Sequence, residues 1–308
     1  MTSPSFIVSL PNAEVRSWLG EAPDGVQFVE WDLSGPPPVD AIDIVVPPYM
    51  GAAQRLGALS HVRAQLVQSL SIGYDGVEAV LPPGNVYANA ASVHEASTAE
   101  MAMALTLSAQ RAIPDFVRAA EKGHWAPQLR ASLADREVLL VGYGGVGRAI
   151  EERLIAFEVT ITRVASHERT DERGTIHATS SLPQLLSSAE IVIIAVPLSK
   201  STTRLVDDDF LSSMRDGALL VNVSRGQVAD TDALVRHASS GRLRFALDVV
   251  DPEPLPDGHP LFALENVLIS PHVGGATTAM PPRAKRLLLE QIRRVQHEET
   301  PLNVVLRS

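Results

Sequence analysis

The chain has 308 residues, 45% of them hydrophobic, and its 26 Lys and Arg against 36 Asp and Glu give a net charge of −10. This length allows two domains with separate cores, and the acidic balance without any basic run argues against nucleic-acid binding. The absence of cysteine excludes disulfides, cysteine nucleophiles and thiolate metal sites, and we predict no bound metal.

Neither export nor membrane insertion is indicated. The segment from Met1 to Leu10 lacks the basic region and the long apolar core of a signal peptide. The most apolar run, Ile191 to Leu198, is far shorter than a membrane span. We therefore expect a cytoplasmic protein that does not bind membranes.

In the first hundred residues, short apolar strands alternate with turn-rich connections. Strands are predicted at Phe6–Leu10, Ile42–Val46 and Gln65–Ser69. Residues 35–38, Gly-Pro-Pro-Pro, form a stiff loop that cannot be helix interior. From Glu95 to Gln110 the chain has no Gly or Pro and is rich in Ala, Met and Leu, which predicts a long, buried helix.

A second run of strands and helices follows, and its alternation predicts a doubly wound parallel sheet, so that the fold class is α/β. After Pro281-Pro282, a last amphipathic helix is predicted from Arg283 to Glu298, followed by an apolar tail from Leu302 to Val305. The predicted strands of this run are Val138–Val141, Val159–Val164, Ile191–Val196, Ala218–Asn222, Phe245–Val249 and Val267–Ile269.

A glycine loop follows the first of these strands, with the pattern Gly142-x-Gly144-x-x-Gly147. The first glycine permits a tight turn, the second lets the backbone approach a pyrophosphate, and the third lets helix pack on strand. Such loops also occur in methyltransferases and as plain turns. The strand before it and the helix after it favour dinucleotide binding by Gly142, Tyr143, Gly144, Gly145, Val146 and Gly147.

Roughly 20 residues beyond such glycines, an acidic residue usually binds the ribose 2′-hydroxyl of NAD. That position falls near Ala165, which is uncharged. Ser166, His167 and Arg169 suit a 2′-phosphate instead, whereas Glu168 suits NAD, and the basic residues can also be merely solvated. We predict NAD(P), with a slight lean toward NADP.

Three polar residues follow later strands in order: Arg225, Glu253 and His272. A guanidinium binds a substrate carboxylate with its fixed fork of donors. A histidine titrates near neutral pH and can protonate a carbonyl oxygen as hydride arrives, and a carboxylate at its other nitrogen raises its pKa. Each residue alone is more often an ordinary surface or loop residue, but together they predict a catalytic set.

With these motifs, the chain resembles the D-isomer-specific 2-hydroxyacid dehydrogenase family from about Gly73 to Val305. The motifs besides the glycine loop are Val93-His94-Glu95, Thr98-Ala99-Glu100, Val196-Pro197-Leu198 with Thr203, Leu220 to Gly226, Ala246-Leu247-Asp248, Glu253 to Pro256, His259 to Phe262, Asn266 to Ile269, Pro271-His272 and Pro301 to Val305. The resemblance implies hydride transfer between NAD(P) and a small 2-keto or D-2-hydroxy acid, in a homodimer.

The resemblance also implies two α/β domains around a cleft. A Rossmann dinucleotide-binding domain would span residues 96–282, and a flavodoxin-like substrate domain would span residues 1–95 and 283–308. It carries over Arg225, Glu253 and His272 as catalytic residues. The substrate-binding residues that we predict are Tyr49, Met50, Ile72, Gly73, Arg225 and His272, and the cofactor-binding residues beyond the glycine loop are Ser166, His167, Arg169, Val196, Pro197, Thr203, Val223, Ser224, Arg225, Asp248, His272 and Gly274.

Other activities on the same scaffold stay open. The first seventy residues match the family loosely, so the identity of the acid does not transfer. Oxidation of formate or phosphite is one alternative, and Glu253 argues against formate because that subfamily resembles this one with glutamine there. A nucleotide-sensing binding protein is another, since a retained catalytic set does not exclude it.

Overall fold

The computed structural model describes residues 6–308, which divide into two compact units. Unit 1 takes the described residues up to His94 together with Thr278–Ser308, and unit 2 takes Glu95–Thr277. The second boundary lies five residues before the expected 283. Helix α8 (Met280–Gln296), which belongs to unit 1, starts before Pro281-Pro282 and not after them as predicted. Proline is tolerated there because residues in the first turn of a helix need no amide hydrogen.

Unit 1 contains a six-stranded sheet in the order β14-β5-β4-β3-β1-β2. The first five strands in sequence thus have the order 2-1-3-4-5 of flavodoxin-like sheets, which confirms the predicted class. They are mutually parallel, whereas the carboxyl-terminal strand pairs antiparallel with β5. The strands are β1 (Phe6–Leu10), β2 (Val26–Glu30), β3 (Ala41–Val45), β4 (Arg63–Gln68), β5 (Val86–Ala88) and β14 (Val304–Arg307).

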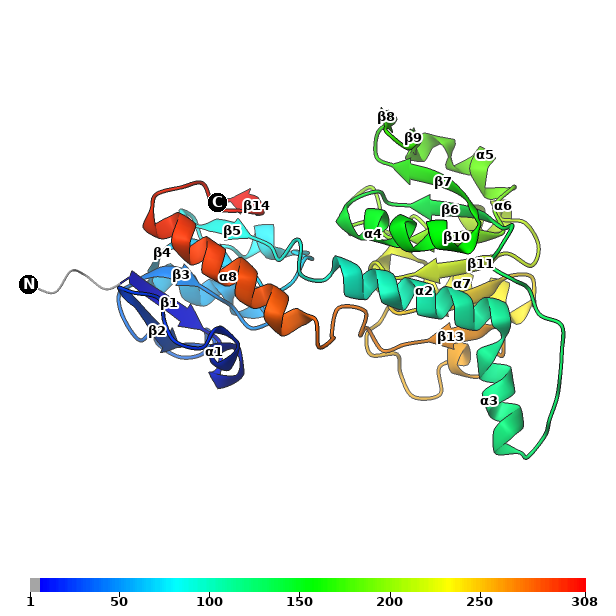
Figure 1. Cartoon of the computed structure of the whole chain (residues 1–308), viewed down its shortest axis with the longest axis horizontal. Helices are drawn as coiled ribbons and strands as arrows, with labels where there is room; N and C mark the ends of the chain where they lie inside the picture. Colours follow the sequence, from blue (N-terminus) through cyan, green and yellow to red (C-terminus); the bar gives the residue numbers. More distant parts are fainter. Residues whose placement is uncertain (1–5) are drawn as a thin grey trace, which may run out of the picture. The chain divides into compact units, whose positions relative to one another are not determined.

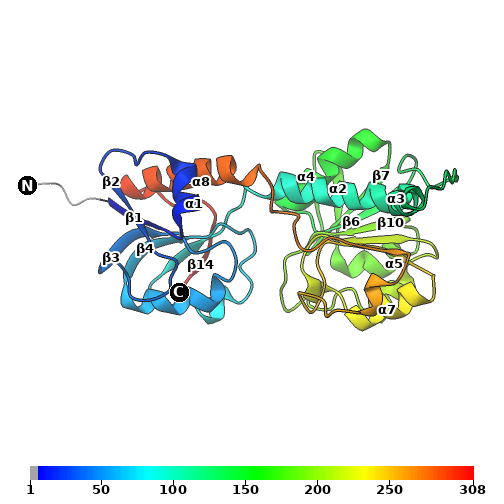
Figure 2. The ribbon, with the colours of Figure 1, turned by 90° about the horizontal axis from the view of Figure 1, so that it is seen from below.

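Both faces of this sheet are covered. Helices α1 (Ala13–Leu19) and α8 lie on one face, and the short 3₁₀ helices η1 (Ala53–His61) and η2 (Val77–Ala79) lie on the other, as Figure 2 shows. Buried residues of α8 recur at spacings of three and four, which places one apolar stripe against the sheet. The predicted tail after α8 joins the same sheet as β14, which pairs with β5.

Unit 2 contains an eight-stranded sheet in the order β13-β12-β11-β10-β6-β7-β9-β8, parallel except for β8. From β9 to β12 this is the six-strand order of a Rossmann domain, with the hairpin strand β8 added at one edge and the parallel strand β13 at the other. Strands were predicted at six of these positions, whereas the hairpin of β8 and β9 was not foreseen. The strands are β6 (Glu137–Val141), β7 (Thr160–Ala165), β8 (Arg169–Asp171), β9 (Gly174–Ala178), β10 (Ile191–Ile194), β11 (Leu219–Asn222), β12 (Arg244–Leu247) and β13 (Val267–Ile269).

Helices cover this sheet on both faces as well (Figures 1 and 2). One face carries α2 (Glu95–Arg111), which confirms the predicted long helix, and α4 (Gly145–Leu154). The opposite face carries α5 (Leu182–Leu186), α6 (Asp208–Ser213) and α7 (Thr231–Ser239). Helix α3 (Ile113–Glu121) follows α2, and the remaining short turns are η3 (Ile155–Phe157), η4 (Thr179–Ser181), η5 (Gly226–Val228) and η6 (Pro260–Phe262).

Nowhere in residues 6–308 does a helix have both the length and the apolar character needed to cross a membrane.

In the sheet of unit 2, the strand order reverses between β6 and β10. Ligands of doubly wound sheets bind beyond the carboxyl ends of the strands at such a reversal. The residues that follow these strand ends therefore form the candidate site.

Candidate active site

The glycine loop begins directly after β6, at the reversal of strand order. Gly142 has φ +106°, and a Cβ there would overlap the carbonyl oxygen of Ala195, just beyond β10. A Cβ on Gly147 would overlap the carbonyl oxygen of Gly142, whereas one on Gly144 would meet nothing within 4 Å. The first and last glycines thus make close packing possible, and the middle one borders open space.

Helix α4 starts inside this loop, and its amino end suits an anion. Its N-cap residue, Gly144, supplies no capping side chain, and its first turn holds no acidic residue. The first amide groups of a helix lack intrahelical partners and lie at the positive end of its dipole. Together with the open space at Gly144, this arrangement fits the pyrophosphate of a dinucleotide.

The turn at the end of β7 lies beside the glycine loop. Ala165 is the buried last residue of the strand, and Ser166, His167 and Glu168 follow as exposed residues. Arg169 opens β8, and its Nη2 donates a hydrogen bond of 3.1 Å to the carbonyl of Tyr143. The predicted 2′-phosphate residues therefore border the glycine loop, while the side chain of Tyr143 is buried, so that only its backbone faces a ligand there.

Further predicted cofactor-binding residues follow β10 and β11, the next strands in the sheet. Val196 is buried, the carbonyl of Pro197 accepts from Thr202 Oγ1 at 2.6 Å, and Thr203 Oγ1 donates to Ser199 at 2.7 Å. Val223 and Ser224 are buried after β11. These residues lie at the carboxyl edge of the sheet, and their part in cofactor binding stays a prediction.

Arg225 is held by the loop that follows β11. Its Nη1 donates to the Ser224 carbonyl at 2.7 Å, and its own carbonyl accepts from Asn222 Nδ2 at 3.2 Å. A Cβ on Gly226 would overlap the carbonyl oxygen of Val250, so the loops after β11 and β12 are in direct contact. This contact brings Arg225 toward the segment that contains Glu253.

His272 and Glu253 form a hydrogen-bonded pair, with His272 Nδ1 2.7 Å from Glu253 Oε2. The other carboxylate oxygen accepts from the Val250 amide at 3.0 Å. The hydrogen bond to Glu253 raises the pKa of His272 despite partial burial. Burial acts to raise the pKa of Glu253, but the hydrogen bonds from His272 and Val250 outweigh it and the pKa is lowered.

The positive charge of Arg225 acts on the pKa of both members of this pair and lowers each. Arg225 therefore lies within electrostatic reach of His272 and Glu253, and unit 2 brings all three predicted catalytic residues together. The His272 and Glu253 side chains are 41% and 34% exposed in the structure. A small molecule can reach the imidazole.

The backbone at His272 has φ +52°, a conformation that non-glycine residues seldom adopt. The Asp248 carbonyl accepts from the His272 amide at 2.8 Å. The buried Asp248 carboxylate accepts from Ser270 Oγ at 2.6 Å, from the Val273 amide at 3.1 Å and from the Gly274 amide at 2.9 Å. Asp248, predicted only as a cofactor-binding residue, thus also holds the loop that contains His272.

Asn222 and Ser270, which fix the loops that carry Arg225 and His272, were not among the predicted site residues. The buried Asn222 Oδ1 accepts from the amide and the hydroxyl of Ser224, at 3.0 and 2.7 Å. Ser270 Oγ donates to Asp248. Their one sequence feature is a polar residue at the end of an apolar strand, which is common at any strand end.

The predicted substrate residues outside this set lie in unit 1, after β3 and β4. Tyr49 stacks on His94 with ring centroids 5.5 Å apart, and Met50 is exposed. The Ile72 carbonyl accepts from Asn89 Nδ2 at 2.8 Å, and Gly73 follows it in the same half-buried turn. Their role in substrate binding stays a prediction.

Residues 103–274 match the family model described as D-isomer specific 2-hydroxyacid dehydrogenase, NAD binding domain. A glyoxylate reductase/hydroxypyruvate reductase of Homo sapiens is 30% identical over 293 residues, which cover 88% of each chain. A glyoxylate reductase of Pyrococcus furiosus is 32% identical over 258 residues, or 79% of this chain and 76% of that protein.

Solved structures agree over nearly the whole chain. The D-isomer specific 2-hydroxyacid dehydrogenase from Xanthobacter autotrophicus Py2, in complex with NADPH and MES, has a TM-score of 0.82 and 27% identity and covers 97% of this chain and 98% of its own. An NADPH-dependent glyoxylate/hydroxypyruvate reductase from Sinorhizobium meliloti, in complex with NADP and malonate, has a TM-score of 0.79 and 26% identity, with coverage of 98% and 97%.

Proposed function

Because the chain belongs to the D-isomer-specific 2-hydroxyacid dehydrogenase family, we propose that it reduces a small 2-keto acid to its D-2-hydroxy acid with NAD(P)H. The observation that carries the proposal is the hydrogen-bonded pair of His272 and Glu253 within reach of Arg225. All three follow strands of the sheet that also carries the glycine loop.

In this reaction Arg225 binds the substrate. Its guanidinium offers two parallel N–H donors to the carboxylate of a 2-keto acid and places a positive charge beside the neighbouring carbonyl. That charge polarises the carbonyl and stabilises the negative charge that develops on its oxygen. The bound nicotinamide supplies the hydride that is transferred to C2.

His272 supplies the proton. Glu253 occupies Nδ1, so Nε2 is the nitrogen that donates to the carbonyl oxygen. The raised pKa of His272 favours the protonated imidazolium, which is the form needed for reduction. In the oxidative direction the neutral imidazole accepts the hydroxyl proton through the same nitrogen.

The dinucleotide would be held by the glycine loop and the amino end of α4, which fit its phosphates. At the end of β7 the last strand residue is Ala165, and Arg169 lies against the loop. A guanidinium suits the 2′-phosphate of NADP, whereas NAD is usually bound there by a carboxylate. We therefore favour NADP, as in the two NADPH or NADP complexes named above.

The named relatives indicate which acids to try first. Several are glyoxylate or glyoxylate/hydroxypyruvate reductases, so glyoxylate and hydroxypyruvate are the proposed substrates. Tyr49, Met50, Ile72 and Gly73 of unit 1 are proposed to contact the acid.

We also propose that the protein is a homodimer and that α3 and the segment after it belong to the interface. No residue of α3 is buried, and Ile113 and Val117 expose apolar surface. Trp125 and Leu129, in the segment that follows, are 95% and 102% exposed. Isolated apolar residues on a surface are ordinary, but several together are typical of interfaces.

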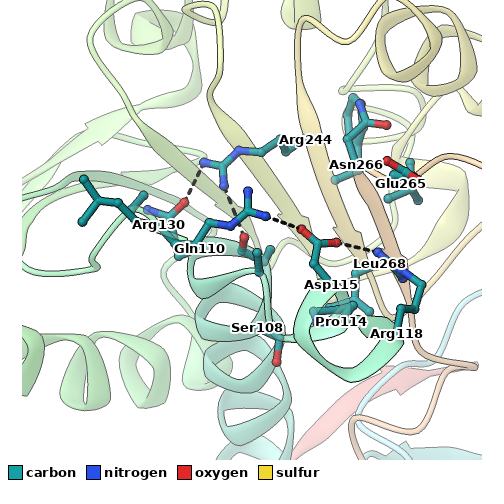
Figure 3. A pocket seen from close by; sticks show the side chains of 16 residues that line it. Ser108, Gln110, Pro114, Asp115, Arg118, Arg130, Arg244, Glu265, Asn266 and Leu268 are labelled. Carbon is teal, nitrogen blue, oxygen red and sulfur yellow. Dashed lines mark hydrogen bonds and ion pairs between the residues drawn. The ribbon is translucent and has the colours of Figure 1, made fainter. Parts of the chain in front are cut away.

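A pocket of about 440 Å³ lies at the amino end of α3 (Figure 3). His272 follows the carboxyl end of β13, at the opposite edge of the sheet. The pocket is bordered by the end of α2, by α3 and by the amino ends of β12 and β13. Within it, Asp115 pairs with Arg118 at 2.6 Å and with Arg130 at 2.9 Å. Leu129 lines this pocket and is also exposed, so the apolar surface of the segment after α3 adjoins a recess, which suits a twofold interface between two copies.

The proposed function is tested by mixing the protein with NADPH or NADH and a panel of glyoxylate, hydroxypyruvate, pyruvate and bulkier 2-keto acids. Loss of reduced-nicotinamide absorbance and chiral analysis of the product report turnover and configuration. We expect turnover with a small acid and a D-configured product. Absence of turnover with every acid of the panel, with NADPH still bound, would favour a nucleotide-sensing protein.

A further inference from the structure

A group of charged and aromatic side chains, of which Tyr143, Glu151 and Arg163 are buried, lies beneath the glycine loop, away from the catalytic residues. We call Tyr143, Glu151, Arg163, Asp171 and Arg173 the Arg163 cluster. They come from the glycine loop, α4, β7 and the hairpin of β8 and β9. The side chains of Arg163 and Glu151 are only 4% and 5% exposed. Buried charges are costly unless well paired, so this cluster needs a reason beyond packing.

Arg163 is enclosed by the turn of the hairpin. Its Nη1 donates to Asp171 at 3.0 Å, and its Nη2 donates to the Arg173 carbonyl at 2.6 Å and to the Thr175 carbonyl at 3.3 Å. Gly174, with φ +103°, permits the tight turn. The hairpin is therefore folded around a buried guanidinium that β7 supplies.

Glu151 links this hairpin to the glycine loop. Its carboxylate accepts the hydroxyl of Tyr143 and pairs with Arg173 Nη1 at 2.6 Å, while Arg163 Nη1 lies 3.5 Å away. Burial raises the pKa of Tyr143, and the hydrogen bond to Glu151 raises it further, so the phenol stays a donor. The Tyr143 ring also lies 5.3 Å from the Arg163 guanidinium carbon.

Two exposed arginines border the cluster on the ligand side. Arg148 on α4 lies with its guanidinium carbon 5.6 Å from the Tyr143 ring, and Arg169 donates to the Tyr143 carbonyl at 3.1 Å. The Arg163 cluster itself contains two arginines and two carboxylates, so its formal charge is balanced. The charge of Arg148 acts in part on Asp171, whose pKa it helps to lower. Arg169, whose printed hydrogen bond is to a backbone carbonyl, is the arginine best placed to act on an anion at the end of β7.

We propose that the Arg163 cluster positions Arg169 for the 2′-phosphate of NADP, with Glu151 as the positioning residue that joins the hairpin to the glycine loop. The proposal rests on the proposed dinucleotide site but not on the identity of the acid. Because Arg169 opens β8, it moves with the hairpin, and the hairpin is fixed through Arg163 and Arg173. A preset guanidinium favours a ligand with the extra phosphate and gains nothing from one that lacks it.

The test compares the dissociation constants of NADPH and NADH for the full chain, measured by fluorescence titration without any keto acid. Arg169→Gln, which removes the direct contact, should reduce the preference for NADPH by about 10- to 100-fold. Glu151→Gln should reduce it by about 10-fold and leave NADH binding nearly unchanged. The matched control is Glu152→Gln, because Glu152 is the next residue on α4 but is exposed; its preference should stay that of the wild type.

Tyr143→Phe removes only the hydroxyl that Glu151 accepts, and it serves if Glu151→Gln does not fold. It should reduce the preference for NADPH by about 2- to 10-fold. Equal weakening of NADPH and NADH, or an unchanged preference in both variants, would overturn the proposal and leave the cluster a packing feature. A wild type without preference for NADPH would overturn it as well, whereas failure of the proposed reductase activity would show in the keto acid panel alone.

Discussion

The imidazole Nδ1 of His272 lies 2.7 Å from Glu253 Oε2, although the two residues are 19 positions apart and follow different strands. The carboxylate is itself held by the Val250 amide at 3.0 Å. The hydrogen bond between Glu253 and His272 fixes which ring nitrogen faces a substrate, and it raises the pKa of His272. Both the orientation and the pKa of the proposed proton donor therefore depend on Glu253.

Glu253→Gln should move the pH profile of keto acid reduction toward lower pH. Reduction needs protonated His272, so kcat/KM falls as the pH rises through the pKa of this residue. Without the carboxylate that raises this pKa, the fall begins at a lower pH. In the oxidative direction the rise of activity with pH should move the same way. Profiles of wild type and variant in both directions are the measurement, and coincident profiles would contradict the assignment.

Replacing His272 by Ala should remove the proton donor. Turnover should fall by at least about 10²-fold, the usual range for loss of a general acid or base. NADPH should still bind with nearly wild-type affinity, because the glycine loop is untouched. Steady-state kinetics and an NADPH titration on the same preparation distinguish loss of turnover from loss of cofactor binding. Near-wild-type turnover would exclude His272 as the proton donor.

Arg225→Gln should raise KM for the keto acid and lower kcat, with kcat/KM down by about 10²-fold or more, because carboxylate binding and carbonyl polarisation are both lost. Arg225→Lys, which keeps the charge without the fork, should recover part of this loss. Arg225 lowers the pKa of His272, so in Arg225→Gln the alkaline fall of reduction should move to higher pH. This shift of the pH profile is opposite in direction to the one expected for Glu253→Gln. Shifts in the same direction in both variants would contradict the placement of Arg225 beside the His272–Glu253 pair.

Asp248→Asn should loosen the loop that holds His272 at positive φ. An amide group presents N–H donors to the backbone amides of Val273 and Gly274, so at least one of these hydrogen bonds is lost. We expect a cost of about 1–3 kcal/mol and a lower Tm, with kcat down by roughly 10-fold. Calorimetry and kinetics are the measurements. Loss of NADPH affinity alone, without a change in Tm, would assign Asp248 to the nicotinamide and not to the loop.

The main strands of both sheets and the glycine loop were predictable because apolar runs and glycine spacing are local patterns. Val267–Ile269, for example, is β13 residue for residue. The hairpin of β8 and β9 was missed because its strands are short and polar, and the pairing that defines them is with each other and with β7. The start of α8 was misplaced because Pro281-Pro282 stands within its first turn, where proline is tolerated.

The residues of the proposed catalytic set could be picked out as types at strand ends, but the groups that hold them in place could not. The Asp248 carboxylate accepts from amides 25 and 26 positions later in the chain. Backbone amides are common to every residue but proline, so no side-chain pattern marks them. In the same way, Glu151 and Arg163 meet only because α4 and β7 lie side by side.

Trp125→Ser and Leu129→Ser should convert the protein from dimer to monomer if α3 and the following segment form the interface. Each change removes an exposed apolar side chain that the single chain does not bury, so the Tm of the isolated subunit should change little. Light scattering after size-exclusion chromatography gives the mass, and dilution of wild type and variants compares their dimer affinities.

The matched control is Met50→Ser, which removes another exposed apolar side chain, at 72% exposure, from unit 1. It should leave the mass of the assembly unchanged. A dimer that survives both changes in unit 2 would place the interface elsewhere, and a monomeric wild type would remove the homodimer from the proposal. Because hot spots at interfaces are enriched in tryptophan, Trp125→Ser should have the larger effect on the dissociation constant.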